Sequence, residues 1–212
     1  MTQITINRAL GELKLLDSRI NNKIRETAFV VTAKKCMDTI SGVKTRKTDF
    51  VTESKANMQS ISDLIERRKQ IKSAIVASNS VTDVVINGKT MKVADAIERK
   101  NSISYEQTLV STMKYQYNQA LSAVNRANEQ VDIKLDELLM VSLGKEGKSK
   151  ATEADIDIIA RPYRAQNEAE MVMADGLDKQ ISLMEIDIMM FLAEVDYTLS
   201  DSNSITKITI AD

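Results

Sequence analysis

The chain has 212 residues, a formal net charge of −1, 43% hydrophobic residues and 4% aromatic residues. It has no His and one Cys, which removes the commonest acid–base residue, any intramolecular disulfide and zinc sites built from several thiolates. One Pro and six Gly interrupt helices little, a composition typical of long packed helices. We therefore expect a mainly α protein that is not an enzyme and holds no cofactor or metal.

The sequence lacks the profile of a membrane protein. The first nine residues do not show the basic and then apolar pattern of a signal peptide. The most apolar stretch, residues 181–195, is interrupted by Glu185, Asp187 and Glu194, which is incompatible with a membrane span. These features predict a cytoplasmic protein without membrane contact.

Apolar residues at helical spacing predict two helices early in the chain. The first runs from about Thr5 to Glu26 and the second from about Thr48 to Ser78. Between them, residues 29–32 read Phe-Val-Val-Thr, which favours a short strand.

A β-hairpin followed by a long helix is predicted next. Residues 84–86 and 89–93 flank an Asn-Gly pair, which suits the positive φ angles of a type I′ turn. A helix then extends from about Val93 to Leu143, and its apolar residues form a coiled-coil seam that ends with Leu138. Such a seam requires partner helices, from this chain or another subunit.

The last part of the chain predicts a loop, a helix and a strand. Residues 144–150 form a polar loop, and Thr152 and Asp155 have the spacing of a capping box. The final helix carries apolar residues up to Leu199, and Pro162 near its start is expected to kink or divide it.

One nine-residue segment occurs twice. Residues 78–86 recur 124 residues later as residues 202–210, with five identical positions. Ser and Asn suit helix-to-strand turns because their side chains satisfy free backbone groups. Because two isolated strands are marginally stable, we expect residues 205–210 to join the hairpin near 81–93 in a three-stranded sheet. This sheet would lie at one end of a single elongated domain of long antiparallel helices over residues 1–212.

The two Ser-Asn-Ser-x-Thr turns and the basic residues beside them form a candidate ligand site. Such groups suit the phosphate or carboxylate of an anionic small molecule, for example a signalling nucleotide. The candidate residues are Arg67, Arg68, Lys72, Ser78, Asn79, Thr82, Arg99, Lys100, Ser202, Asn203 and Thr206. The simpler alternative is that the polar residues only cap helices and the cations pair with carboxylates.

Charge is distributed unevenly along the chain. Residues 151–212 carry a net charge of −9, and residues 1–150 carry +8. An acidic helix beside a basic helix explains this asymmetry most simply, either within the chain or in a homo-oligomer. The low aromatic content and the pI of about 5.7 argue against nucleic-acid binding.

The chain resembles an uncharacterised helical family from Firmicutes and their phages, some members of which are labelled "septicolysin". The resemblance lies in residues 63–75, in the Ile86-Asn87-Gly88-Lys89 turn and in residues 93–100. Residues 195–200 fit the same pattern. The resemblance implies no established activity, and nothing in the chain is typical of a pore-forming segment. We expect a non-enzymatic oligomeric protein of phage origin that sequesters an anionic ligand. The alternative is a helical protein for phage assembly or for inhibition of a host protein.

Overall fold

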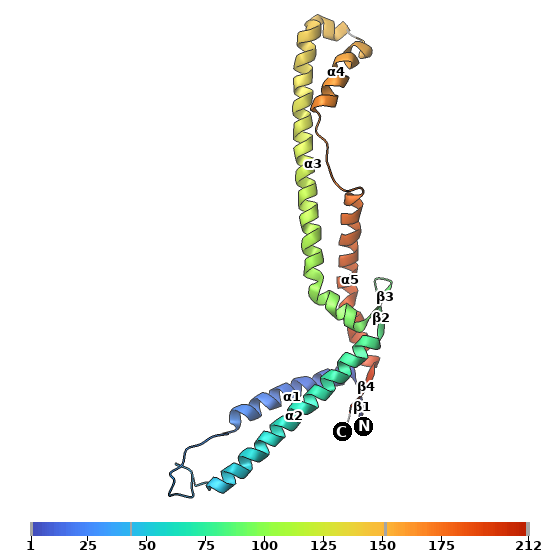
Figure 1. Cartoon of the computed structure of the whole chain (residues 1–212). Coiled ribbons are helices and arrows are strands. Elements are labelled where there is room, and N and C mark those ends of the chain that lie inside the picture. The colour runs from blue at the N-terminus through green and yellow to red at the C-terminus, as the bar shows by residue number, and fades with distance from the viewer. Residues whose placement is uncertain (1, 43, 151, 211–212) are drawn as a thin grey trace. The chain divides into compact units, whose positions relative to one another are not determined.

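The computed structural model describes residues 2–42, 44–150 and 152–210, with the backbone alone for 145–150 (Figure 1). The elements in chain order are β1 (Thr2–Thr5), α1 (Ile6–Glu26), α2 (Lys47–Val81), β2 (Asp83–Ile86), β3 (Lys89–Lys92), α3 (Val93–Lys150), α4 (Glu153–Asn167), α5 (Leu177–Ile205) and β4 (Lys207–Ile210). This mainly α fold with long helices and small antiparallel sheets confirms the expected class. Residues 1–101 with 190–212 form one compact unit, and residues 102–189 form a second.

The first unit contains two separate two-stranded sheets. Strand β1 pairs antiparallel with β4, and β2 pairs antiparallel with β3 across the turn at Asn87 (φ 51°) and Gly88 (φ 68°). The hairpin prediction is therefore confirmed. The prediction of a three-stranded sheet was wrong, because β4 pairs with β1, a strand that we did not predict. In β1 the side chain of Ile4 is buried whereas that of Gln3 is exposed, the alternation of a half-buried strand.

The chain repeats one order of elements, and the recurring nine-residue segment marks the end of each repeat. Strand β1 leads into α1, and α2 returns to β2; strand β3 leads into α3, and α5 returns to β4. The two junctions use the same backbone hydrogen bond, from Ile6 N to Thr206 O (3.0 Å) and from Val93 N to Thr82 O (2.9 Å). Each sheet therefore takes one strand from each repeat.

This repeat makes a circular permutation testable. Because Thr2 lies opposite Ile210 as Lys89 lies opposite Ile86, an Asn-Gly linker from Ile210 to Thr2 recreates the existing turn. A permutant that carries this linker and opens between Asn87 and Gly88 is expected to keep the circular-dichroism spectrum of the parent and a Tm within about 5 °C. A control that opens between Ile71 and Lys72, inside α2, is expected to lose the cooperative transition.

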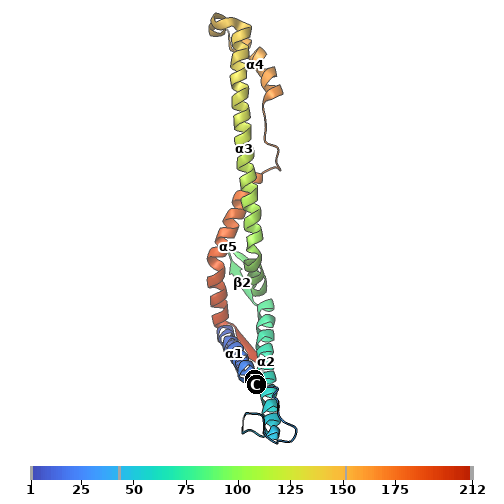
Figure 2. The ribbon, with the colours of Figure 1, turned by 90° about the vertical axis from the view of Figure 1, so that its left-hand side faces the viewer.

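Helices α1 and α2 form a hairpin whose core continues onto the β1–β4 sheet. The two helices lie side by side in both views (Figures 1 and 2). Helix α1 begins at the N-cap Thr5, whose Oγ1 accepts a hydrogen bond from Arg8 N, and both helices have nearly the predicted bounds. The buried core comprises Ile4, Ile6, Ala9, Leu13, Leu16, Ile20, Ile71, Ile75, Ile208 and Ile210. The strand predicted at 29–32 is wrong, since these residues are exposed and extend between the helices.

In the second unit, α4 folds back against α3. Their contact consists of Leu135, Leu139 and Ala160, with four half-buried apolar neighbours. Leu138 is 37% exposed, so the predicted seam position is wrong: from Val131 the buried face continues at spacings of four. The predicted loop at 144–150 is also wrong, because the backbone stays helical on both sides of a break at Gly144 (φ 69°).

Two helices stand where one final helix was predicted. Pro162 lies inside α4, and the chain divides after Asn167, with residues 168–176 leading to α5 through Gly176 (φ 73°). The predicted capping box at the start of α4 is confirmed: Thr152 Oγ1 accepts from Asp155 N (3.4 Å), and Asp155 Oδ2 accepts from Thr152 N (3.0 Å).

The capping box predicts a pH-dependent contribution to the stability of α4. Hydrogen bonds from the Thr152 hydroxyl and N–H lower the pKa of the Asp155 carboxyl. Because the folded pKa lies below the unfolded value of 3.8, this stabilisation is present above pH 3.8 and is lost as the pH falls through the folded pKa. Thr152→Ala is therefore expected to lower the Tm of the α3–α4 region more at about pH 7 than at about pH 2, where the hydrogen bond from Asp155 N to Thr152 Oγ1 persists but the carboxylate contribution is reduced. An equal effect at both pH values would show that the carboxylate contributes nothing.

Candidate functional site

The two Ser-Asn-Ser-x-Thr segments end helices instead of forming turns. Ser78 to Ser80 lie in the last turn of α2, and Ser202 to Ser204 lie in that of α5, so the predicted turn conformation is wrong. The following threonine closes each helix: Thr82 N donates to Ser78 O (3.0 Å), and Thr206 N donates to Ser202 O (2.9 Å). The Thr82 hydroxyl also donates a hydrogen bond to Ser78 O (2.8 Å), which further stabilises the end of α2. Capping, the simpler alternative, therefore accounts for these threonines.

Several polar side chains of the segments also have structural positions. Ser202 is buried, and the exposed Ser204 Oγ accepts a hydrogen bond from Asn7 Nδ2 (2.7 Å), which links α5 to the start of α1. Asn203 is half-buried. Asn79 differs, because its Oδ1 is enclosed and accepts no hydrogen bond from the part of the chain that the structure describes. An enclosed acceptor calls for a donor, not for an anion.

Most of the predicted cations are engaged with other side chains. Arg67 Nε lies 3.2 Å from Glu12 Oε1, and Arg68 Nε lies 2.5 Å from Asp17 Oδ1, so both arginines tie α2 to α1. The bond to Asp17 raises the pKa of the Arg68 guanidinium. Lys100 pairs with the carboxylate of Asp196 on α5.

The two remaining cations have different surroundings. Arg99 stacks on the ring of Phe191, 4.4 Å from its centroid, and Lys72 is exposed on α2. Four of the five cations are thus held by contacts within the chain. Whether the repeat segments bind an anion stays a prediction.

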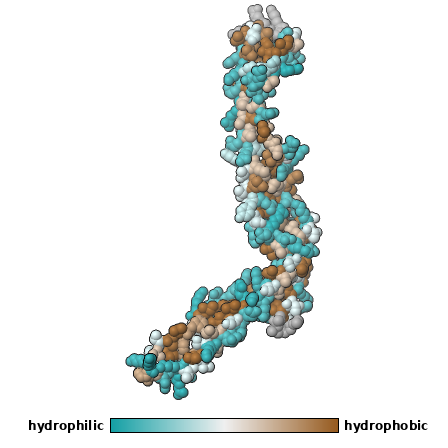
Figure 3. All heavy atoms as spheres, viewed as in Figure 1, coloured by the Kyte–Doolittle hydropathy of each residue, from teal (hydrophilic) through white to brown (hydrophobic). Residues whose placement is uncertain are grey.

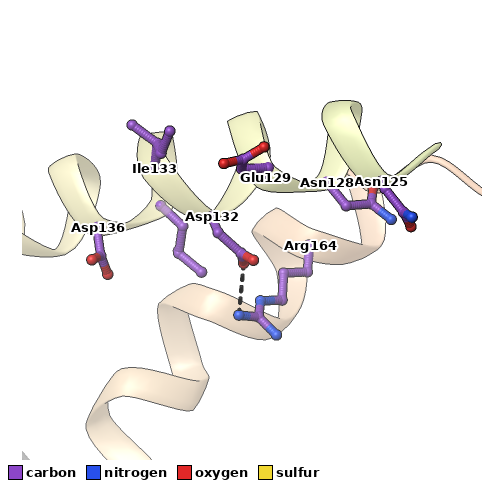
Figure 4. Close-up of a pocket in the computed structure, with 8 residues that line it drawn as sticks. Asn125, Asn128, Glu129, Asp132, Ile133, Asp136 and Arg164 are labelled. Carbon is purple, nitrogen blue, oxygen red and sulfur yellow. Dashed lines mark hydrogen bonds and ion pairs between the residues drawn. The ribbon is translucent and has the colours of Figure 1, made fainter. Parts of the chain in front are cut away.

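A groove between α3 and α4 was not predicted from the sequence. It has a volume of about 610 Å³, and Figure 4 shows the residues around it. It is lined by Asn125, Asn128, Glu129, Asp132, Ile133, Leu135, Asp136 and Arg164. The acidic side chains recur on one stripe of α3 at helical spacing, a signal that was present in the sequence.

Two interactions fix the geometry of this groove. The side-chain amide of Asn128 donates to Ala169 O (3.1 Å) and accepts from Ala169 N (2.8 Å), which holds the segment after α4 against α3. Arg164 Nη2 donates to Asp132 Oδ1 (2.9 Å), as the dashed line in Figure 4 marks. Glu129 and Asp136 add two further carboxylates, so the lining has a formal charge of −2. The groove therefore suits a cationic surface.

No family model matches the chain, and neither the curated proteins nor the solved structures include a match. Over the described residues, no cluster of three or more acidic or thiol side chains has the arrangement of a metal site. Within the same ranges, no helix is both long and apolar enough to cross a membrane.

Proposed function

We propose that the chain is a protein-interaction and assembly module that associates with further copies through exposed apolar helix faces. The observation that supports this best is a stripe on α2, defined as Val51, Met58 and Ile65. Their side chains are 50%, 55% and 47% exposed. They recur every seven residues, the repeat of a coiled-coil seam that needs a partner helix of the same pitch.

The exposure of apolar residues extends well beyond this stripe. Brown patches follow the α1–α2 hairpin in the space-filling view (Figure 3). On α1 and α2, the apolar side chains of Leu15 (62%), Ile24 (44%) and Val76 (55%) are exposed as well. Apolar exposure of this extent supports association, because monomeric proteins rarely expose large contiguous apolar areas.

The geometry of α1 and α2 supports the same function. Two helices bury one face each against the other, and α1, with 21 residues, is about 31 Å long. Two helices side by side over this length present roughly 600–800 Å² on one side, close to what one partner contributes to a stable complex. A second helical pair would complete a four-helix arrangement.

The engaged cations favour assembly over anion sequestration. Carboxylates of the same chain already pair with Arg67, Arg68 and Lys100. An anionic ligand would have to displace these carboxylates. The resemblance to a family of Firmicutes and their phages is consistent with a role in phage assembly, which is the form of assembly that we propose.

Paired substitutions on α2 test this function. Met58→Ser with Ile65→Ser removes two apolar contacts from the stripe and leaves the buried face intact. We expect this variant to raise the dissociation constant of the self-association at least tenfold in sedimentation velocity, because each buried apolar side chain contributes about 1.5–3 kcal/mol. Gln59→Ser with Gln70→Ser changes exposed polar residues on a different side of the same helix and serves as the control. Equal association of both variants and the parent would refute a role for the stripe.

A further inference from the structure

The connection between α1 and α2 is long and largely exposed. It covers residues 27–46, beyond the usual upper length of about 12–15 residues for a structureless connection in a compact domain. Apart from a bridge between Thr39 and Arg46, its described residues form no strand or helix. Long connections of this kind are commonly functional. We call residues 27–46 the tip loop.

The tip loop combines exposed apolar side chains with positive charge. Phe29 is 40% exposed, Val30 is 87% exposed and Met37 is 49% exposed. Four exposed cations (Lys34, Lys35, Lys44 and Arg46) stand against one carboxylate, Asp38, which gives the loop a formal charge of +3. The surface that fits this loop is acidic with apolar residues among the carboxylates.

The interior contacts of the loop leave these side chains on its outside. Lys47 Nζ donates to Lys34 O (2.7 Å), and Ile40 N donates to Thr45 O (3.1 Å). Ile40 itself is buried, so one side of the loop is anchored. Lys34 is therefore fixed through its backbone while its side chain is exposed.

The α3–α4 groove has the complementary chemistry. Its lining carries a formal charge of −2, and Ile133, 49% exposed, lies among the carboxylates. The two units differ in net charge in the same sense as the groove and the loop. Residues 102–189 have a formal net charge of −6, and the rest of the chain has +5. Each copy therefore has one basic apolar loop and one acidic apolar groove.

We propose that the tip loop of one copy docks in the α3–α4 groove of a second copy. This inference rests on the proposed function and specifies one contact within it. Because loop and groove are different surfaces, the contact is head-to-tail, and repeating it produces a ring or an open chain of subunits. The pairing of opposite charges steers the approach, and the exposed apolar residues of both surfaces are buried on docking. Salt weakens the contact, because the screening length for exposed charges falls from about 8 Å at 0.15 M salt to about 3 Å at 1 M.

Complementary charge reversal tests the proposal. The loop variant is Lys35→Glu with Lys44→Glu, and the groove variant is Glu129→Lys with Asp136→Lys. We expect each variant alone to raise the dissociation constant of self-association at least about tenfold. When the two variants are mixed in equal amounts, the reversed loop meets the reversed groove. Light scattering is then expected to recover the mass of the parent assembly, which a misfolded variant would not allow.

The control reverses two exposed cations outside both proposed contacts, Lys179→Glu on α5 with Lys207→Glu on β4, and is expected to associate as the parent does. Failure of the mixture to recover the parent mass overturns the proposal. A loop variant that associates like the parent also overturns it, and the assembly function then stands on the apolar stripe of α2 alone. A parent that shows no self-association at any concentration overturns both this proposal and the proposed assembly function. Because the stripe variant and the charge-reversal variants change different residues, their separate effects distinguish the two contacts.

Discussion

Phe191→Ala is expected to lower the free energy of unfolding of the first unit by about 3–5 kcal/mol. Phe191 is 0% exposed, and the guanidinium of Arg99 stacks on its ring at 4.4 Å. Truncation leaves a cavity the size of a phenyl ring and removes the cation–π contact as well. Chemical denaturation followed by circular dichroism measures the change.

Tyr197→Ala provides the matched control for this result. Tyr197 is an aromatic residue of the same helix, α5, but it is 77% exposed. Its replacement removes a side chain of similar size without opening a cavity, so we expect a change within about 0.5 kcal/mol. If both substitutions cost the same, Phe191 does not contribute to the core of the first unit.

Ile4→Asp is expected to destabilise the first unit by at least about 3 kcal/mol, because it places a carboxylate in an apolar core. Ile4 is 6% exposed and belongs to the cluster that joins the β1–β4 sheet to α1 and α2. The neighbouring Gln3 points to the opposite, exposed face of β1, so Gln3→Asp is the control with the same charge change.

Thermal unfolding measures the loss of overall stability in Ile4→Asp, and amide hydrogen exchange measures the loss of pairing between β1 and β4. The Ile4→Asp variant is expected to lose the protection of the β4 amides together with its Tm, whereas Gln3→Asp keeps both. Equal loss in both variants would contradict the pairing of Thr2–Thr5 with Lys207–Ile210.

Local signals in the sequence predicted the elements well. The Asn87-Gly88 turn, the capping box at Thr152 and the helical spacing of α1 and α2 depend on residues close in the chain, and the structure confirms each. The partner of β4 was not predictable in this way, because the pairing of Ile4 with Ile208 joins residues from opposite ends of the chain. The short Thr2–Thr5 segment offers only one buried position, too little for a periodic pattern.

The candidate site shows the same limit. The recurring Ser-Asn-Ser-x-Thr segment was found from the sequence, and it marks a true structural equivalence between the ends of α2 and α5. Its interpretation as two turns was wrong because Ser and Asn are compatible with both a final helical turn and a loop. The pairing of Arg67 and Arg68 with Glu12 and Asp17 required knowing that α1 packs along α2. The α3–α4 groove required the return of α4, which no local pattern encodes.

Self-association is the central claim, and the mass of the parent chain in solution tests it most directly. Multi-angle light scattering should be recorded over a concentration series from about 1 µM to 500 µM, at low and at high salt. We expect a mass that rises above that of the 23.6 kDa chain with concentration and that falls only in part as salt is added, because salt weakens the loop–groove contact but not the apolar stripe. A constant mass of one chain across the whole series would contradict it.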